Sequence, residues 1–246
     1  MINGGFFNRN NQLPLGALRY NNRWISGPIL GRGAIGWDNQ GNTVVDRLTL
    51  QSSVTANNQT FSISALNSGY VKAGIARYTD NWGAEYTTLI DNETVITVQD
   101  SQVTQQRTLG TAGQDTLPIP PGGYLLILRA SNSSAPAFSP GTRITLNERY
   151  SPTIFERFPH VLGAGPLLIS NGQIVLNPQQ EGFSKSFSQG KAPRSVFGIT
   201  ATGQIKLVAI QQRVNGPGPS LEETTQVKTR GTTSIQIECL RTSQCL

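Results

Sequence analysis

The side chains available for acid–base chemistry in this chain are carboxylates and cations rather than histidines. His160 is the only histidine, so any catalytic triad or histidine-rich metal centre would have to include it. It lies in the segment 158–162, which offers no partner pattern, and this favours a structural role. If the chain is an enzyme, its acid and base are therefore Asp or Glu side chains, assisted by Arg and Lys. This set of residues points to glycosidic or phosphate-ester chemistry.

Positive charge is spread over the whole sequence, with a formal net charge of +6 and a pI near 9.6. No run of Lys or Arg stands out, which disfavours nucleic acid as a partner. A phosphorylated sugar or polysaccharide substrate needs only two or three convergent cations, and the scattered charge is compatible with that. The oligomeric state stays open.

The sequence predicts neither a membrane span nor an export signal. No apolar stretch approaches the roughly 20 residues that cross a bilayer. Met1 is followed by Asn3, Gly4 and Gly5, not by the basic and apolar residues of a leader.

Length and composition predict one mostly β domain over residues 1–246. A chain of 246 residues can bury a sizeable core. Charged residues make up only 14% of the chain, and its apolar runs are short, often β-branched and separated by Asn, Gly and Pro. We expect an α+β fold, mostly β, with mixed or antiparallel sheets and a few helices.

Two hairpins are predicted in the last third of the chain. The Asn171–Gly172 dipeptide stands between apolar stretches within 167–176, which is the strongest short-range signal for a hairpin. Residues 195–200 and 204–210 form the second predicted pair, and Gly203 can adopt the positive φ that a tight turn requires.

One helix is predicted at about 220–230. Ser220 is a favourable N-cap, Glu223 completes a capping box, and Gly231 can stop the helix. Alternating Ile and polar residues then predict a strand over 234–239.

The cysteines predict no zinc site. Cys239 and Cys245 both fall in the last eight residues, and their spacing without a nearby histidine matches no familiar zinc pattern. A terminal disulfide and two free thiols both remain open. No cofactor is clearly indicated; a divalent cation near the phosphate stays open, although it has no clear ligand set.

A set of short motifs in a fixed order gives the chain a family resemblance. The motifs are Met-Ile-Asn-Gly-Gly-Phe-Phe at 1–7, Leu66-Asn67, the segment 78–83, the segment 163–168 with Asn171-Gly172, the segment 193–198, and the segment 220–223. They resemble the phosphodiester glycosidase domain, the family of the uncovering enzyme N-acetylglucosamine-1-phosphodiester alpha-N-acetylglucosaminidase. The form is similar to cyanobacterial members.

The resemblance implies a reaction and a location. Members hydrolyse a sugar-1-phosphodiester at the anomeric carbon and release the sugar, and they are usually periplasmic or secreted. Because phosphate is a good leaving group, cations that hold it matter more than a strong acid.

The resemblance also implies the residues of the site. Arg194 would hold the phosphate, since its planar guanidinium can bind two oxygens. Glu223 would activate water or attack the anomeric carbon, and Glu238 falls where the family has an Asp. Residues expected to contact the substrate are Asn3, Gly4, Gly5, Phe6, Gly165, Pro166, Lys185 and Ser195.

Structural roles compete with these assignments. Lys185 and Lys191 could decorate an exposed loop, Arg194 could pair with a carboxylate, and Glu223 is also the capping-box residue. Catalysis predicts that Asn3, Arg194 and Glu223 converge on one cleft, with Glu238 as a further candidate.

The C-terminal segment departs from the family pattern. The family continues with an Asp-Gly-Gly-x-Ser-type loop, whereas this chain has Cys239 and Leu240 after Glu238, which replaces both glycines. Together with the Asn-Gly-Gly turn at a terminus that would normally fray, this predicts a domain truncated at both ends. The competing hypothesis is a carbohydrate-binding or structural module without turnover.

Overall fold

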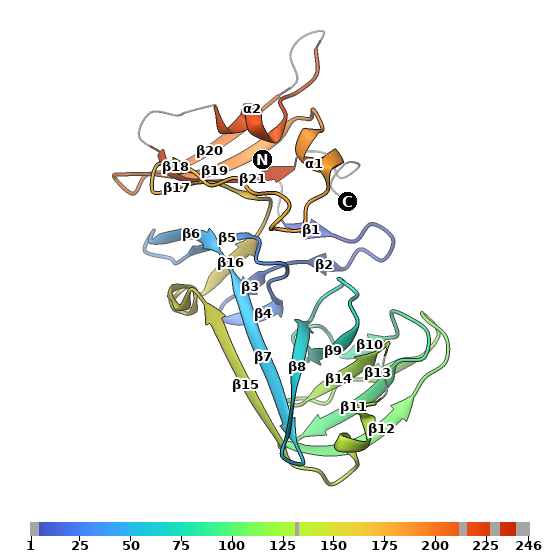
Figure 1. The fold of residues 1–246 in the computed structure, drawn as a ribbon. Coiled ribbons are helices and arrows are strands. Elements are labelled where there is room, and N and C mark those ends of the chain that lie inside the picture. The colour runs from blue at the N-terminus through green and yellow to red at the C-terminus, as the bar shows by residue number, and fades with distance from the viewer. Residues whose placement is uncertain (1–4, 131–132, 212–215, 227–231, 240–246) are drawn as a thin grey trace. The chain divides into compact units, whose positions relative to one another are not determined.

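The computed structural model describes residues 5–130, 133–211 and 216–226 in full, and the backbone of 232–239. Internal contacts divide the chain into unit 1 (residues 1–22, 28–49 and 151–246) and unit 2 (residues 23–27 and 50–150). The fold is mostly β, with two short α-helices in the described part (Figure 1), which confirms the predicted class. Whether these two units belong to one domain, as the sequence predicts, is not decided by this division, so the single domain stays a prediction.

Unit 1 contains two larger groups of paired strands and the hairpin β1-β2. In one group β3, β16, β5 and β6 pair in that order, and the other has the order β18-β17-β21-β19-β20. The elements are β1 (Phe6–Phe7), β2 (Pro14–Leu15), β3 (Leu18–Tyr20), β5 (Gly33–Trp37), β6 (Thr43–Arg47), a 3-10 helix η2 (Thr153–Arg157), β16 (His160–Gly163), β17 (Leu167–Ser170), β18 (Gln173–Ile174), α1 (Lys185–Gln189), β19 (Arg194–Thr200), β20 (Ile205–Ile210), α2 (Leu221–Thr225) and β21 (Thr232–Cys239).

Strand β19 separates two apolar clusters of unit 1. Val196 packs with Phe187 of α1 and Leu221 of α2. Phe197 packs with Ile35 of β5 in a second cluster. Because side chains alternate between the faces of a strand, even-numbered residues of β19 face the two helices and odd-numbered residues face the other way.

Both predicted hairpins are confirmed. Strands β17 and β18 pair antiparallel, with Asn171 at φ 50° and Gly172 at φ 75°. Both positive φ values are what a two-residue hairpin turn of type I′ requires. Strands β19 and β20 also pair antiparallel, and Gly203 has a φ of 78°.

Helix α2 begins where it was predicted but is shorter. The Ser220 hydroxyl accepts from the Glu223 N–H, and the Glu223 carboxylate accepts from the Ser220 N–H, so the capping box is present. The helix ends at Thr225, while residues 227–231, including the predicted stop, lie outside the described part. The Thr224 and Thr225 hydroxyls both donate to backbone carbonyls of the preceding turn. Such side-chain-to-backbone hydrogen bonds slightly destabilise a helix.

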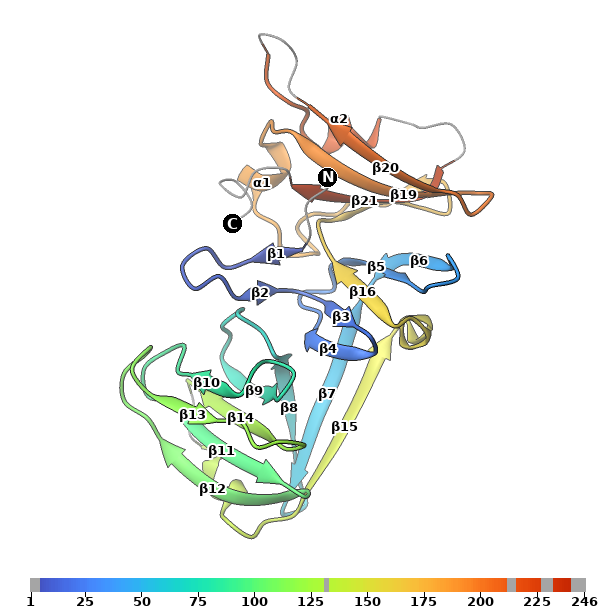
Figure 2. The same cartoon turned by 180° about the vertical axis from the view of Figure 1, so that it is seen from behind.

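Unit 2 is built around one strongly curved sheet with the strand order β12-β11-β14-β9-β8-β7-β15 (Figures 1 and 2). A bridge between Gln102 and Arg143 joins the two ends of this order, so the sheet closes around an apolar interior that includes Val54, Ile96 and Phe138. The elements are β4 (Arg23–Ser26), β7 (Thr49–Ala56), β8 (Gln59–Leu66), β9 (Gly74–Thr79), β10 (Glu85–Thr87), β11 (Thr94–Gln99), β12 (Gln102–Thr108), β13 (Thr116–Pro118), β14 (Tyr124–Arg129), a 3-10 helix η1 (Ala135–Phe138) and β15 (Ile144–Ser151).

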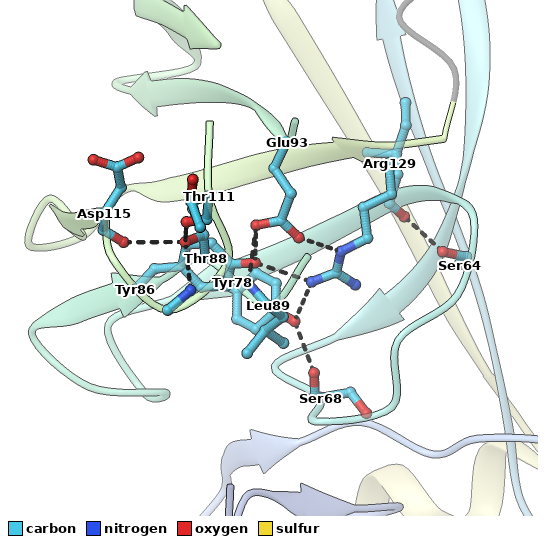
Figure 3. A network of polar contacts seen from close by, with 12 residues as sticks. Ser64, Ser68, Tyr78, Tyr86, Thr88, Leu89, Glu93, Thr111, Asp115 and Arg129 are labelled. Carbon is cyan, nitrogen blue, oxygen red and sulfur yellow. Dashed lines mark hydrogen bonds and ion pairs between the residues drawn. The ribbon is translucent and has the colours of Figure 1, made fainter. Parts of the chain in front are cut away.

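A buried ion pair between Arg129 of β14 and Glu93 lies in a network of polar contacts with Tyr78 and Tyr86 (Figure 3). The Arg129 Nε lies 2.7 Å from the Glu93 carboxylate, and the two side chains are 1% and 0% exposed. Arg129 also donates to the hydroxyls of Tyr78 and Tyr86, and the latter donates to Glu93. Burial raises the pKa of both tyrosines, so both hydroxyls keep the protons they donate.

Candidate active site

Arg194 is the first residue of β19 and is buried, with 1% of its surface exposed. Its Nη2 donates to the carbonyls of Gly190 at 2.6 Å and Phe187 at 3.5 Å, and its Nε donates to Pro219 at 3.2 Å. No carboxylate of the described residues pairs with it. Burial lowers the pKa of Arg194 to about 10, so the side chain is still a cation at neutral pH.

Two of the carbonyl partners of Arg194, Gly190 and Pro219, lie close in sequence to the other charges of the site. Gly190 precedes Lys191, and Pro219 precedes the N-cap Ser220. The Lys191 Nζ lies 3.4 Å from the Glu223 Oε1, and both side chains are about half exposed. By binding the carbonyls of Gly190 and Pro219, the buried Arg194 holds the backbone close to the exposed ion pair of Lys191 and Glu223.

Glu223 is held as a carboxylate. Its Oε2 accepts the Ser220 N–H at 2.7 Å, and this bond, with a further contribution from Lys191, holds the pKa of Glu223 below its usual value. An ionised carboxylate can act as a base or a nucleophile but not as an acid.

Phe6 and Lys185 are placed around the same helix. The centroid of the Phe6 ring lies 6.1 Å from that of Phe187 in α1. The guanidinium carbon of Arg194 lies 5.6 Å from the centroid of the same Phe187 ring. Lys185 is the first residue of α1 and is exposed. The structure therefore gathers Phe6, Lys185, Arg194 and Glu223 around the short helices of unit 1.

The N-terminal motif meets the Gly-Ala-Gly-Pro motif. A Cβ atom added to Gly5 would lie 2.8 Å from the carbonyl oxygen of Gly163, so only glycine allows this approach. Gly165 and Pro166 follow two residues later and are buried. Two segments far apart in the sequence are thereby packed side by side.

Ser195 lies on the opposite face of β19 from Arg194. It is 1% exposed, and its hydroxyl has no hydrogen-bond partner in the described part of the chain. The backbone of Glu238 lies directly opposite Ser195 in the antiparallel pair β19-β21. The side chains of Glu238 and Cys239, and all of Asn3, Gly4 and Cys245, lie outside the described residues. The roles assigned to these residues stay predictions.

A buried carboxylate of unit 1 was missed by the sequence analysis. Glu181 is 0% exposed and accepts the N–H groups of Gly33 and Leu167. It also forms an ion pair of 2.9 Å with Arg47. Because Leu167 directly follows Pro166, this carboxylate holds one of the family motifs in place. A signal did exist, since Glu181 is the one Asp, Glu, Lys or Arg between Arg157 and Lys185.

Among the described residues, no group of three or more His, Cys, Asp or Glu side chains is placed to hold a metal ion. No described helix is long and apolar enough to cross a membrane.

Comparison with known proteins defines the class. A model of the phosphodiester glycosidase family matches residues 92–233, which is more than half of the chain. The chain therefore belongs to the phosphodiester glycosidase family, as the ordered motifs predicted. No curated protein matches significantly.

Two solved structures share the fold. A hypothetical protein from Synechocystis is 48% identical with a TM-score of 0.90, over 96% of this chain and 45% of that protein. A protein from Burkholderia pseudomallei K96243 is 21% identical with a TM-score of 0.70, over 95% of this chain and 57% of that protein. The chain thus spans about half the length of the solved proteins that it resembles.

Proposed function

We propose that this chain hydrolyses sugar-1-phosphodiesters of the N-acetylglucosaminyl type at the anomeric bond, at a site formed by Arg194, Lys191 and Glu223. The observation that carries the proposal is the link between these residues: Arg194 donates to the carbonyl of Gly190, next to Lys191, and to that of Pro219, just before the helix α2 that carries Glu223. Family membership supplies the reaction class.

The charges of the site suit a phosphate leaving group. Nε and Nη2 of Arg194 donate to carbonyls, while Nη1 has no partner among the described residues and is the group left to bind a phosphate oxygen. Lys191 adds a second, exposed cation. Cations placed to stabilise the negative charge that develops on the leaving phosphate oxygen lower the activation barrier, so no general acid is needed. The ionised Glu223 fits the role of base or nucleophile.

Replacing Arg194 by methionine is expected to lower turnover about 100- to 1,000-fold, as the loss of a preorganised charge donor does in other enzymes. The measurement is release of N-acetylglucosamine from a model N-acetylglucosaminyl phosphodiester by the purified, folded chain. Arg157→Met is the matched control, because Arg157 is exposed in the same unit. Undiminished turnover by a folded Arg194→Met variant would remove Arg194 from the site.

A binding module without turnover is the second candidate. The observation that favours it is that Arg194 is almost fully buried and that its Nε and Nη2 already donate hydrogen bonds to backbone carbonyls. A folded chain that binds the sugar but releases none from the phosphodiester would establish this alternative.

Glu223→Gln is expected to lower turnover about 100-fold or more while leaving the unfolding midpoint close to that of the wild type. Glutamine can still accept the Ser220 N–H in a capping box, so the change removes the charge and keeps the cap. Because the pKa of Glu223 is lowered, the wild-type rate should fall only when the pH drops below the ordinary glutamate value of about 4.3. The pH–rate profile checks this, and Glu222→Gln, an exposed neighbour on α2, should behave as wild type.

A further inference from the structure

Strand β20 is the last strand of its sheet in unit 1, and no described strand pairs with its outer edge (Figures 1 and 2). Its residues Val208 and Ile210 pack in the cluster that contains α1 and α2. Ile205 and Leu207 lie on the opposite face of the strand and are 46% and 57% exposed. Two large aliphatic side chains are thus exposed along an unpaired sheet edge, an arrangement that sheets in monomeric proteins usually avoid.

The backbone of the same residues points out of this edge. The Thr200 N–H donates to the Gln204 carbonyl at 2.9 Å, so these two residues form a hydrogen-bonded pair of β19 and β20. Hydrogen-bonded and non-hydrogen-bonded pairs alternate along antiparallel strands. In the observed register Leu207 therefore belongs to a non-hydrogen-bonded pair, as do Ile205 and Ala209. The N–H and C=O groups of these three residues point away from β19.

A second copy of β20 fits this edge in one central register. A new hydrogen-bonded pair must join two residues whose backbone groups both point outward. An antiparallel copy centred on Leu207 meets this condition, because Leu207 then lies opposite the partner's Leu207 and Ile205 lies opposite the partner's Ala209. We propose that this chain forms a symmetric dimer in which two β20 strands pair antiparallel about Leu207. The proposal goes beyond the hydrolytic site and does not depend on turnover.

The charge and size of the side chains on β20 suit a second copy of the same strand. Lys206 is the one charged residue of β20. In the proposed register it lies opposite the partner's Val208, so two like charges do not face each other directly. The small Ala209 leaves room for the larger Ile205, and the two-fold axis makes this contact occur twice. The other end of the sheet is β18, whose two residues offer a much shorter edge.

The test is sedimentation velocity of the full chain over a concentration series, which should show a monomer–dimer equilibrium. Leu207→Lys and Leu207→Glu should each raise the dissociation constant of the dimer about tenfold or more, because each places two like charges opposite each other in place of an apolar pair. Mixing the two variants should restore dimers, since lysine then faces glutamate. Ile174→Lys is the matched control, because Ile174 is 56% exposed at the other end of the same sheet.

Several outcomes would overturn the proposal. A wild-type chain that stays monomeric at every concentration would show that no second copy covers this edge. A dimer that neither Leu207 variant weakens, or that Ile174→Lys dissociates, would place the interface elsewhere. Mixed Leu207→Lys and Leu207→Glu chains that remain monomers would exclude the register centred on Leu207. Thermal unfolding of each variant confirms that it is folded, which is expected because Leu207 is exposed and makes no contact in the apolar cluster around α1 and α2.

Discussion

Replacement of Arg129 by methionine is expected to lower the free energy of unfolding by about 3–5 kcal/mol, the range seen when one partner of a buried ion pair is removed. Glu93 would remain as a carboxylate that is 0% exposed and no longer faces a cation. Tyr78 and Tyr86 would each lose a donor as well. The measurement is urea unfolding followed by tryptophan fluorescence, to which Trp82 contributes from its contact with Tyr78.

The second variant of this experiment separates charge from packing. Glu93→Gln keeps an acceptor for the Tyr86 hydroxyl and the Leu89 N–H but removes the charge, so the double variant Arg129→Met/Glu93→Gln should recover part of the lost stability. Arg107→Met, an exposed change in the same unit, should cost little. Strictly additive losses in the double variant would show that the pair is not energetically coupled.

Replacement of Glu181 by alanine is expected to destabilise unit 1 by a similar amount, about 3–5 kcal/mol. The loss has two physical sources. The N–H groups of Gly33 and Leu167 would be left without their acceptor, and Arg47 would lose its carboxylate. Thermal and urea unfolding of the variant measure the loss, and Glu156→Ala, an exposed carboxylate of the same unit, is the control.

The pH dependence of stability gives an independent test at Glu181. Burial raises the pKa of this carboxyl, against the opposing effects of the Gly33 N–H and Arg47. Because the pKa is raised in the folded state, ionising Glu181 costs more in the folded chain than in the unfolded chain. The proton-linked part of the stability is therefore fully present below the unfolded value of about 4.3 and is lost as the pH rises through the folded value, while the contacts of the carboxylate with Arg47 and the two N–H groups remain. Glu181→Gln removes this titration, so the stability of the wild type relative to this variant should fall between about pH 4 and the folded pKa. A difference that rises with pH would contradict this assignment.

Local features of the fold were predictable because their causes are local. The Asn171–Gly172 turn needs two residues that tolerate positive φ, and the sequence places them between two apolar runs. The Ser220–Glu223 cap needs only two side chains three residues apart. The end of α2 was predicted less well, because the hydroxyls of its two threonines compete for the backbone in a way that the capping rules ignore.

The partners of the charged residues were not predictable in this way. From the sequence alone, Arg194 could bind a phosphate or pair with a carboxylate. In the structure its hydrogen-bond acceptors are the carbonyls of Phe187, Gly190 and Pro219. Arg129 and Glu93 stand 36 positions apart in the chain, and neither has a neighbouring motif that marks it. A charged side chain is buried only where several segments that are distant in sequence come into contact, and no short sequence pattern predicts such a contact.

By itself the sequence determined the mostly β class, both hairpins, the N-terminus of α2 and the family, since each follows from neighbouring residues or from motifs in a fixed order. Only the tertiary structure decided that Gly5 packs on Gly163, that Glu181 secures the start of β17, and that Arg194 binds the backbone next to Lys191 and next to the helix of Glu223. These contacts depend on chain segments that return from far along the sequence, and burial then makes the hydrogen bonds obligatory, because an unpaired polar group in the interior is costly.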